Sequence, residues 1–397
     1  MQTTAAVIAS SEPSMTLRLV VGVIIVVVAF AYAGKRAWFL YRLISSGQPA
    51  VGRTDQVPVR VEAEVTEVLG QKKLLQWTVP GIAHVFAMWG FIVLTLTIIE
   101  VFGALVWADF GIPVIGQWPV IGFIEDLFAV LVVVGIVTFA IIRLRHNPAK
   151  QGRYSRFFGS HTGAAWIVLA GIFTVVWTLL LYRAAQINTG VFPFESGAFA
   201  SEWLAGILEP LGETTNAWLE TIGIWLNIAV IVGFLVFVLH SKHLHIFMAP
   251  INVATSRRPN ALGPLLPMYS GADKIDFEDP ADDAVFGRGR IEDFTWKGNL
   301  DMATCTECGR CQSQCPAWNT DKPLSPKLLM MTLRDHAEAK TPYLRALREE
   351  GGNSERALEL VGANATGDSA DAVNWAELSL VGATGYDLAS PLTAYDP

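Results

Sequence analysis

The feature that most constrains this chain is a set of five long apolar runs. They cover residues 17–34, 80–106, 120–142, 164–182 and 222–248. About 20 residues of α-helix are needed to cross the hydrocarbon core of a bilayer. Only 16% of the residues are charged, and the mean hydropathy is +0.40, which excludes an ordinary soluble protein. We therefore predict an all-α protein whose residues 1–250 form a membrane domain with five transmembrane helices.

Residues 251–397 differ in composition from the rest of the chain. They are polar, acidic and rich in Gly, Pro and Asp, and they contain no run long enough to span a membrane. We predict that they form a separate, water-facing domain. The first apolar run is too long for a signal peptide and is followed by Lys35, Arg36 and Arg42, so we predict that it is a true membrane span.

The basic residues between the apolar runs predict the orientation. Lys and Arg are frequent between the first and second runs and between the third and fourth runs. The second and third runs have neither between them, and the fourth and fifth have only Arg183, beside several glutamates. Because cytoplasmic loops carry the excess of basic residues, we expect a multi-pass protein of the cell (inner) membrane. Its N-terminus is expected outside and its polar tail in the cytoplasm.

All four cysteines of the chain lie in one short motif within the polar tail. Cys305, Cys308, Cys311 and Cys315, followed by Pro316, have the spacing C-x2-C-x2-C-x3-C-P. This is the spacing of bacterial ferredoxins that bind [4Fe–4S] clusters. Zinc is the alternative, but zinc sites usually pair two C-x2-C elements across a longer loop. We predict an iron–sulfur site.

In such a motif the fourth cysteine, here Cys315, normally binds a second cluster. The sequence contains no second cysteine run to complete that cluster. We therefore expect two [4Fe–4S] clusters in the complete domain, with the missing ligands on a C-terminal continuation or on a partner subunit. Residues 323–340 are expected to form one helix and residues 342–350 to begin another. Helices on either side of a cysteine loop predict the first half of an α-helical ferredoxin-type domain.

Histidines occur near the cytoplasmic ends of two predicted spans. His84 lies near the start of the second, and His240, His243 and His245 lie near the end of the fifth. Histidines at such positions often only form hydrogen bonds at the interface. An imidazole within a span is nevertheless a functional candidate, and two imidazoles at one depth could bind a b-type haem between their helices. On one helix His240 and His245 would point about 140° apart, so only one of them could bind the iron.

The segment LHIFMAPINVATSRR (244–258), preceded by SK at 241–242, resembles the end of the last span in the haem-bearing gamma subunit of membrane nitrate reductases. This resemblance implies His84 and His245 as the two haem ligands, with His240 and His243 as less favoured candidates. The ligands of that family's second haem would fall on Leu94 and Asn227, which are not histidines. We therefore expect one haem b.

A haem-bearing membrane domain fused to an α-helical ferredoxin is the layout of membrane iron–sulfur oxidoreductases related to heterodisulfide reductase. The segment CTECGRCQSQCPAWNTDKPLSPKLL (305–329) is similar to the actinobacterial members. The resemblance implies an enzyme, an electron transfer flavoprotein:menaquinone oxidoreductase that passes electrons from fatty-acid oxidation to the quinone pool. Part of the catalytic apparatus would then lie on the missing continuation.

Other functions were weighed against electron transfer. One is a reductase acting on a disulfide or another thiol or organic-acid substrate, and another is a membrane anchor that binds no haem. The acidic tail argues against nucleic acid as a partner, since phosphate binding needs a basic surface. No motif marks the quinone site or the direction of electron flow. Glu100, Glu125 and Asp126 are weaker candidates for handling protons, since such carboxylates are more often interfacial. His146 and His161 are expected to be interfacial, or to lie near a quinone or a haem propionate.

Overall fold

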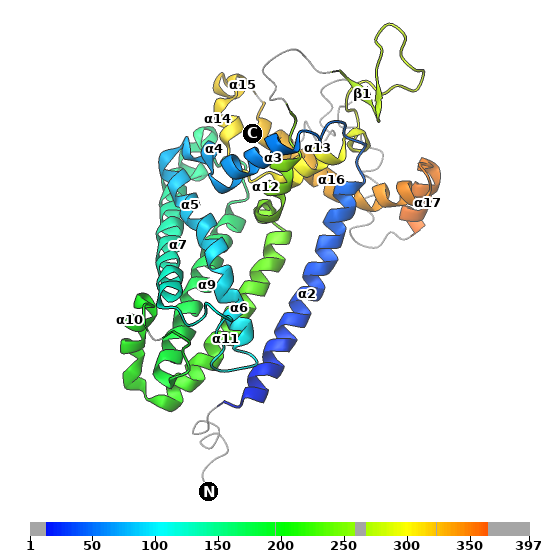
Figure 1. Ribbon diagram of the computed structural model, residues 1–397. Coiled ribbons are helices and arrows are strands. Elements are labelled where there is room, and N and C mark those ends of the chain that lie inside the picture. Colours follow the sequence, from blue (N-terminus) through cyan, green and yellow to red (C-terminus); the bar gives the residue numbers. More distant parts are fainter. Residues whose placement is uncertain (1–12, 195, 259–266, 323, 364–397) are drawn as a thin grey trace. The chain divides into compact units, whose positions relative to one another are not determined.

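The computed structural model describes residues 13–194, 196–258, 267–322 and 324–363, and its secondary structure is almost entirely helical (Figure 1). Within these residues the strands are limited to a hairpin of β1 (Tyr269–Ser270) and β2 (Asp273–Lys274), which pair antiparallel. The all-helical prediction is confirmed. Residues 364–397, which end the predicted iron–sulfur domain, lie outside the described residues.

Five helical segments of the described chain are long and apolar enough to cross a membrane, as predicted. The second consists of two helices, and the third continues past its main helix into a short connecting turn. The main helices are α2 (Met15–Ser45), α5 (Thr78–Val93), α6 (Thr95–Gly103), α7 (Pro119–Arg145), α9 (Thr162–Thr189) and α11 (Glu213–Leu239).

The fifth long helix ends earlier than the predicted span 222–248. α11 stops at Leu239, and Ser241 has an extended backbone with φ −134° and ψ 169°. The Ser241 hydroxyl accepts a hydrogen bond from the backbone N–H of His243 and so caps a new turn, η4 (Lys242–Leu244). α12 (His245–Ala254) then begins. His240 and His245 are therefore not on one helix, and the 140° argument does not apply to them.

The remaining elements are shorter helices and turns, with one longer helix near the C-terminal end of the described chain. They are α3 (Val57–Ala63), η1 (Glu64–Leu69), α4 (Lys72–Leu75), α8 (Pro148–Gln151), η2 (Gly152–Tyr154), α10 (Phe199–Leu208), η3 (Glu209–Leu211), η5 (Ile291–Asp293), α13 (Trp296–Thr304), α14 (Arg310–Gln314), α15 (Pro316–Asn319), α16 (Pro326–Glu349) and α17 (Ser354–Ala363). The two helices expected from residues 323–350 are a single helix, α16, which contains Pro342.

The chain divides into two compact units. The first contains Met1–Gly34, Gln71–Arg145 and Thr162–Val238, and the second contains Lys35–Gly70, His146–His161 and Leu239–Pro397. This division differs from the predicted domain boundary at residue 250. The two segments that precede Gln71 and Thr162 join the polar tail, because their side chains pack and hydrogen-bond with it, as described below.

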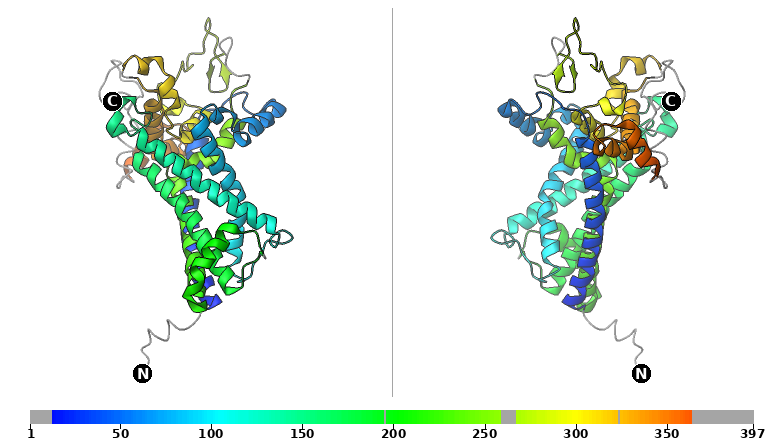
Figure 2. Two further views of the ribbon diagram at one scale, coloured as in Figure 1. Left: turned by 90° about the vertical axis from the view of Figure 1, so that its left-hand side faces the viewer. Right: turned by 90° about the vertical axis from the view of Figure 1, so that its right-hand side faces the viewer.

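In the first unit, α7 packs against both α5 and α9 (Figure 2). Small residues allow a close approach, as is common between membrane helices. A Cβ atom at Gly135 of α7 would lie 2.8 Å from the carbonyl oxygen of Ala83 in α5. The core between the helices is aliphatic and includes Val101, Ile136 and Ile228. The unit thus has a tightly packed interior built from small and branched side chains.

The outer surface of the first unit is also apolar. In α2, Ile24 is 58% exposed and Val27 is 61% exposed. A water-soluble bundle would place polar residues at such positions, whereas lipid solvates aliphatic side chains. A buried ion pair joins α2 to α11, with 2.7 Å between Arg18 Nη1 and Glu220 Oε1. These features are those expected of a helical bundle in a membrane.

The second unit has its own core, formed by α13, α16, α17 and the last turns of α2. Leu43 packs there with Met302, Leu344 and Ala357. Backbone hydrogen bonds from Gln48 N to Phe294 O and from Trp296 N to Gln48 O, 2.9 and 3.0 Å long, join the segment after α2 to the start of α13. Residues far apart in the sequence therefore support the loop that carries the cysteines.

Candidate functional site

The cysteine motif lies between α13 and α15, in residues 305–315, which include the short helix α14 and are called the cysteine loop below. α13 ends at Thr304, and Cys305 is already extended. Gly309 has φ 75°, and a Cβ atom at this position would lie 2.1 Å from the carbonyl oxygen of Arg156, so only glycine fits here. Cys308 and Cys311 are exposed, Cys305 and Cys315 are half-buried, and all four are free thiols.

The donor set fits an iron–sulfur cluster, since four free thiols lie within one short loop. In the described part of the chain, however, no three His, Cys, Asp or Glu side chains are already close enough to hold a metal ion. Burial raises the pKa of the Cys305 thiol and that of the Cys311 thiol. Metal binding at these residues therefore requires the thiols to lose protons.

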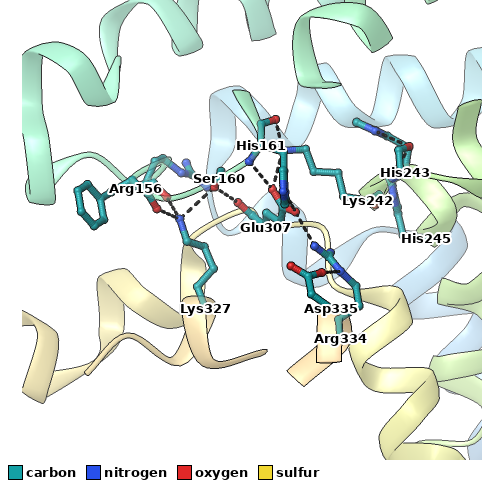
Figure 3. A network of polar contacts seen from close by, with 12 residues as sticks. Arg156, Ser160, His161, Lys242, His243, His245, Glu307, Lys327, Arg334 and Asp335 are labelled. Carbon is teal, nitrogen blue, oxygen red and sulfur yellow. Dashed lines mark hydrogen bonds and ion pairs between the residues drawn. The ribbon is translucent and has the colours of Figure 1, made fainter. Parts of the chain in front are cut away.

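Glu307 lies inside the motif, between the first two cysteines, and is almost fully buried. Its carboxylate accepts hydrogen bonds from the backbone N–H of His161 at 2.9 Å, from Lys242 Nζ at 2.9 Å and from Arg334 Nη2 at 3.1 Å. His161 Nδ1 lies 2.8 Å from Oε1 of the Glu307 carboxylate. Figure 3 shows these three residues around Glu307.

The surroundings of the Glu307 carboxyl strongly favour its ionised form over its protonated form. Burial by itself raises the pKa of this carboxyl, but the ammonium of Lys242 and the hydrogen bonds from His161 outweigh burial and hold the pKa at about 2. The backbone of Glu307 has φ 55°, an uncommon conformation for a residue with a side chain. The buried contacts of the side chain stabilise this conformation and so fix the first turn of the cysteine loop.

The segment before α9 also contacts the cysteine loop. Arg156 donates from Nε and Nη2 to the Cys308 carbonyl oxygen, at 3.1 and 3.0 Å. Ser160 Oγ donates to the Glu307 carbonyl oxygen at 3.1 Å. Lys327 of α16 donates to the carbonyl oxygens of Arg156 and Phe158 and to Ser160 Oγ (Figure 3). Burial lowers the pKa of Lys327 to about 8.

These cations surround the place where a negatively charged cluster would be held. Arg156, Lys242, Lys327 and Arg334 are all half-buried or buried. These four residues and Glu307 are not predicted from the sequence. Two features of the sequence could have indicated this network. They are the acidic residue between the first two cysteines and the lysine of the SK pair at 241–242, which can pair with it. His161 is predicted from the sequence to be interfacial or to lie near a quinone or a haem propionate. In the structure it is a hydrogen-bond partner of the Glu307 carboxylate.

The segment that carries the three late histidines belongs to the same unit. His245 is the first residue of α12, and its Nδ1 lies 3.3 Å from the Lys242 carbonyl oxygen. The rings of His243 and His245 are 6.0 Å apart. Lys242 itself binds Glu307, so a single residue links the histidine segment to the cysteine loop (Figure 3).

His84 belongs to the other unit, where it lies on α5. Its Nδ1 is 2.9 Å from Oε1 of Gln71, a buried residue with φ 50°. Because the amide oxygen can only accept, Nδ1 carries the hydrogen, and this tautomer directs the lone pair of Nε2 away from Gln71. A hydrogen bond of this kind orients metal-binding histidines. Gln71 gave no sequence signal.

Leu94 and Asn227 stand where the gamma-subunit family has the ligands of its second haem, and both pack in the interior of the first unit. Leu94 belongs to the apolar core of the first unit. Asn227 is buried in α11, and its amide donates to Val175 O and Thr178 Oγ1, both at 2.9 Å. Neither side chain offers a haem ligand, so the residues present do not fit a haem at this place.

The three carboxylates predicted as proton-handling candidates lie together in the first unit. Arg183, which the sequence analysis placed outside the membrane spans, is in α9 and is 1% exposed. Its guanidinium lies 2.9 Å from Glu125 and 3.2 Å from Asp126. His146 is in the turn before α8, where its carbonyl oxygen accepts a hydrogen bond from Ser155.

Curated relatives of this chain are iron–sulfur proteins. The chain is 32% identical over 292 residues to "Probable iron-sulfur-binding oxidoreductase FadF" of Bacillus subtilis (strain 168), covering 71% of this chain and 37% of that protein. It is 26% identical over 373 residues to "EtfAB:quinone oxidoreductase" of Syntrophomonas wolfei subsp. wolfei, covering 89% and 47%. It is 33% identical over 92 residues to "Probable membrane-anchored ferredoxin" of Chromohalobacter salexigens, covering 22% and 13%.

The chain spans less than half the length of each of these relatives. No protein-family model and no solved structure matches it. The chain is therefore similar to membrane-associated iron–sulfur oxidoreductases of electron transfer, in agreement with its apolar helices and its cysteine motif.

Proposed function

We propose that this protein transfers electrons between a soluble donor, the electron transfer flavoprotein, and the menaquinone pool of the cell membrane. Its carriers would be [4Fe–4S] clusters and one haem b, and its electrons would come from fatty-acid oxidation, as the resemblance to actinobacterial oxidoreductases implies. The observation that carries the proposal is the buried pair of Lys242 and Glu307, since it joins the cysteine loop to the segment of His245. The name of the Syntrophomonas relative supports the choice of donor and acceptor.

Cys305, Cys308 and Cys311 would hold the first cluster, and Cys315 would serve a second. A cluster at these residues supplies one-electron transfer when bound. The chain's own contribution is to fix the loop through Glu307 and to surround it with Lys242, Lys327, Arg334 and Arg156. Cations near a cluster offset the negative charge that its thiolates and added electrons bring.

His84 and His245 would hold the haem. A bis-imidazole haem supplies a second one-electron centre when bound. Gln71 fixes the tautomer of His84, and the Lys242 carbonyl oxygen lies within reach of the ring nitrogen Nδ1 of His245. Both contacts would fix the orientation of the imidazole rings that hold the haem. Leu94 and Asn227 argue for one haem rather than two.

We propose that the second unit faces the cytoplasm and that the protein is multi-pass. The second unit gathers the two basic connecting segments, 35–70 and 146–161, together with the polar tail. Basic connecting segments remain on the cytoplasmic side of a membrane. Trypsin added to inverted vesicles is expected to cleave this unit, whereas trypsin added to intact spheroplasts is expected to leave it whole.

The experiment that tests the proposed function is quinone reduction by the purified protein in lipid nanodiscs. Reduced electron transfer flavoprotein and a short-chain menaquinone are supplied, and quinol formation is followed. We expect turnover by the wild-type protein and none by Cys308→Ser. A cofactor-loaded wild-type protein that accepts no electrons from the flavoprotein would contradict the choice of donor.

A second candidate function is that of a membrane anchor for an iron–sulfur protein, without haem. It is favoured by the similarity to a membrane-anchored ferredoxin over 92 residues. A reduced-minus-oxidised optical spectrum distinguishes the two. A b-type haem band supports the electron-transfer protein, and its absence from protein that carries iron and sulfide supports the anchor.

A further inference from the structure

Five polar side chains meet inside the first unit, apart from the cysteine loop. Glu100 comes from α6, Glu125 and Asp126 from α7, and Tyr182 and Arg183 from α9. All five are at most 6% exposed. The electrostatic interactions among them link Glu100 to Glu125 and Arg183, and Tyr182 to all four of the others. The group therefore contains three carboxyls, one guanidinium and one phenol.

Asp126 is fully satisfied as an anion. Its carboxylate accepts hydrogen bonds from the backbone N–H groups of Ala200 and Ser201, both at 2.8 Å, and from Ser201 Oγ at 3.0 Å. The two N–H groups belong to the first turn of α10, where the helix dipole favours a negative charge. Arg183 adds a fourth donor at 3.2 Å. Four hydrogen-bond donors therefore surround the Asp126 carboxylate.

Arg183 is shared between Asp126 and Glu125. Its Nη1 bonds to Asp126 and its Nη2 bonds to Glu125. Within the described residues, Arg183 Nε, Glu125 Oε1, Glu100 Oε1 and the Tyr182 hydroxyl are buried without a hydrogen-bond partner. One guanidinium thus already serves two carboxylates, and four further polar atoms in the same region are not satisfied by side chains or backbone.

Glu100 differs from the other two carboxyls because no ion pair joins it to a cation in the described residues. An ionised Glu100 would be the third carboxylate beside one cation, next to the apolar core of the bundle. Burying an uncompensated charge in such surroundings costs several kcal/mol, and a carboxyl avoids this cost by binding a proton. A neutral acid can also donate a hydrogen bond, which the neighbouring carboxylate and phenol oxygens can accept.

We propose that Glu100 is a proton-binding site of the first unit. It holds a proton as a neutral carboxylic acid, next to Glu125 and Tyr182, and exchanges it with water. The proton is the ligand of this site, and Asp126 and Arg183 form its fixed ionic support. This assignment does not depend on any cofactor.

The use of the proton rests on the proposed function. Reduction of a quinone to a quinol takes up two electrons and two protons, so a membrane protein that reduces quinone needs groups that deliver protons. Glu100 is suited to deliver one of them. The site can be tested without electron transfer, and so its failure is distinguishable from failure of the proposed function.

Infrared spectroscopy of the protein in nanodiscs tests the proposal directly. A protonated carboxyl gives a C=O band that is absent from carboxylates and that shifts in heavy water. We expect such a band at neutral pH in the wild-type protein and its loss in Glu100→Gln. Glu220 provides the matched control, because this buried carboxylate has its own counter-ion in Arg18 at 2.7 Å. Glu220→Gln is expected to retain the band.

A band that survives in Glu100→Gln would overturn the proposal. Glu100→Asp keeps the acid if the glutamine variant does not fold, and it is expected to move the band without abolishing it. Tyr182→Phe removes the phenolic hydroxyl and is expected to shift the frequency of the band. An unchanged band in Tyr182→Phe would remove Tyr182 from the site.

Once donor, cofactors and quinone are in place, Glu100→Gln is also expected to slow quinol formation several-fold. The rate at which the flavoprotein reduces the iron–sulfur signal should stay unchanged. Equal slowing of both steps would contradict a role in proton delivery.

Discussion

Lys242 and Glu307 form a buried ion pair with 2.9 Å between Nζ and Oε2, and their side chains are 3% and 1% exposed. Lys242 lies three residues before His245, and Glu307 lies between Cys305 and Cys308. The pair therefore connects the two motifs that predict cofactors. Removing one partner of an ion pair buried to this degree strongly destabilises the folded protein, because the other charge stays buried without a counter-ion.

Replacement of Glu307 tests this connection. Glu307→Gln leaves Lys242 and Arg334 without their carboxylate, and we expect it to lower the free energy of unfolding of the second unit by about 3 kcal/mol. We also expect less iron and acid-labile sulfide per protein. Chemical denaturation and iron analysis provide the measurements.

The matched control for Glu307 is Glu338, which pairs with Arg36 at 2.7 Å but is 35% exposed. Glu338→Gln is expected to change the free energy of unfolding by no more than about 1 kcal/mol, because exposed pairs are weak. Equal effects of the two substitutions would contradict the importance assigned to Glu307.

Gly309 offers a test that does not change any charge. Gly309→Ala places a side chain at φ 75°, against the Arg156 carbonyl oxygen, and should cost about 2 kcal/mol while lowering cluster content. Gly362 is the control, since it lies in α17 with open space around its Cα. Gly362→Ala should leave stability unchanged or raise it by about 0.5–1 kcal/mol. Circular dichroism during denaturation measures both.

His336 makes the stability of the second unit depend on pH. It is fully buried in α16, and burial, helped by the Lys340 ammonium, lowers its pKa to about 4. The unfolded chain binds a proton near pH 6.5, but the folded protein does so only near pH 4. Stability is therefore expected to fall, on the order of 3 kcal/mol, as the pH drops from 6.5 to 4.

His336→Gln is expected to remove this part of the pH dependence, because glutamine does not titrate. His146→Gln alters an exposed histidine and is expected to leave the dependence as in the wild-type protein. Unfolding in denaturant at a series of pH values measures all three proteins. If the stability of His336→Gln falls with decreasing pH as steeply as that of the wild-type protein, the pH dependence arises from other groups.

The haem assignment makes a prediction for Gln71 as well as for the histidines. His84→Ala and His245→Ala should each abolish the b-type band, whereas His240→Ala and His243→Ala should retain it. Gln71→Leu removes the partner of Nδ1 of His84 and should weaken haem binding about 10–100-fold. Haem titration of the apoprotein measures this. Haem retained in both His84→Ala and His245→Ala would redirect the assignment to His240 or His243.

The sequence predicts the architecture well because lipid imposes a simple rule. A run of about 20 apolar residues in a membrane has few alternatives to a helix, so five runs predict five helices. The ends of the helices are less predictable. Apolar residues resume at Leu244, so the predicted span continues to residue 248, but residues 240–243 are His, Ser, Lys and His. There the backbone N–H of His243 donates to Ser241 Oγ and a new turn starts. Hydropathy averaged over a long run does not show such a local break.

The position of the cysteine motif is plain in the sequence because its spacing is itself the signal, and binding of a cluster by these cysteines stays a prediction. The surrounding residues could not be predicted, since Lys242, Glu307 and Arg334 are far apart in the sequence and meet only through tertiary packing. The same holds for Arg183. A charged residue at the end of an apolar run is expected in a loop, but Arg183 is buried in the bundle, where it pairs with Glu125 and Asp126.

The measurement that tests the central claim most directly is reduction of the haem by the soluble donor, followed optically in wild-type protein and in Cys308→Ser. Electron transfer through the cysteine motif predicts that reduced electron transfer flavoprotein generates the reduced b-type band in the wild-type protein. It also predicts no such band in Cys308→Ser, although dithionite still reduces the haem of that variant. Reduction of the haem in Cys308→Ser by the flavoprotein at the wild-type rate would contradict the claim.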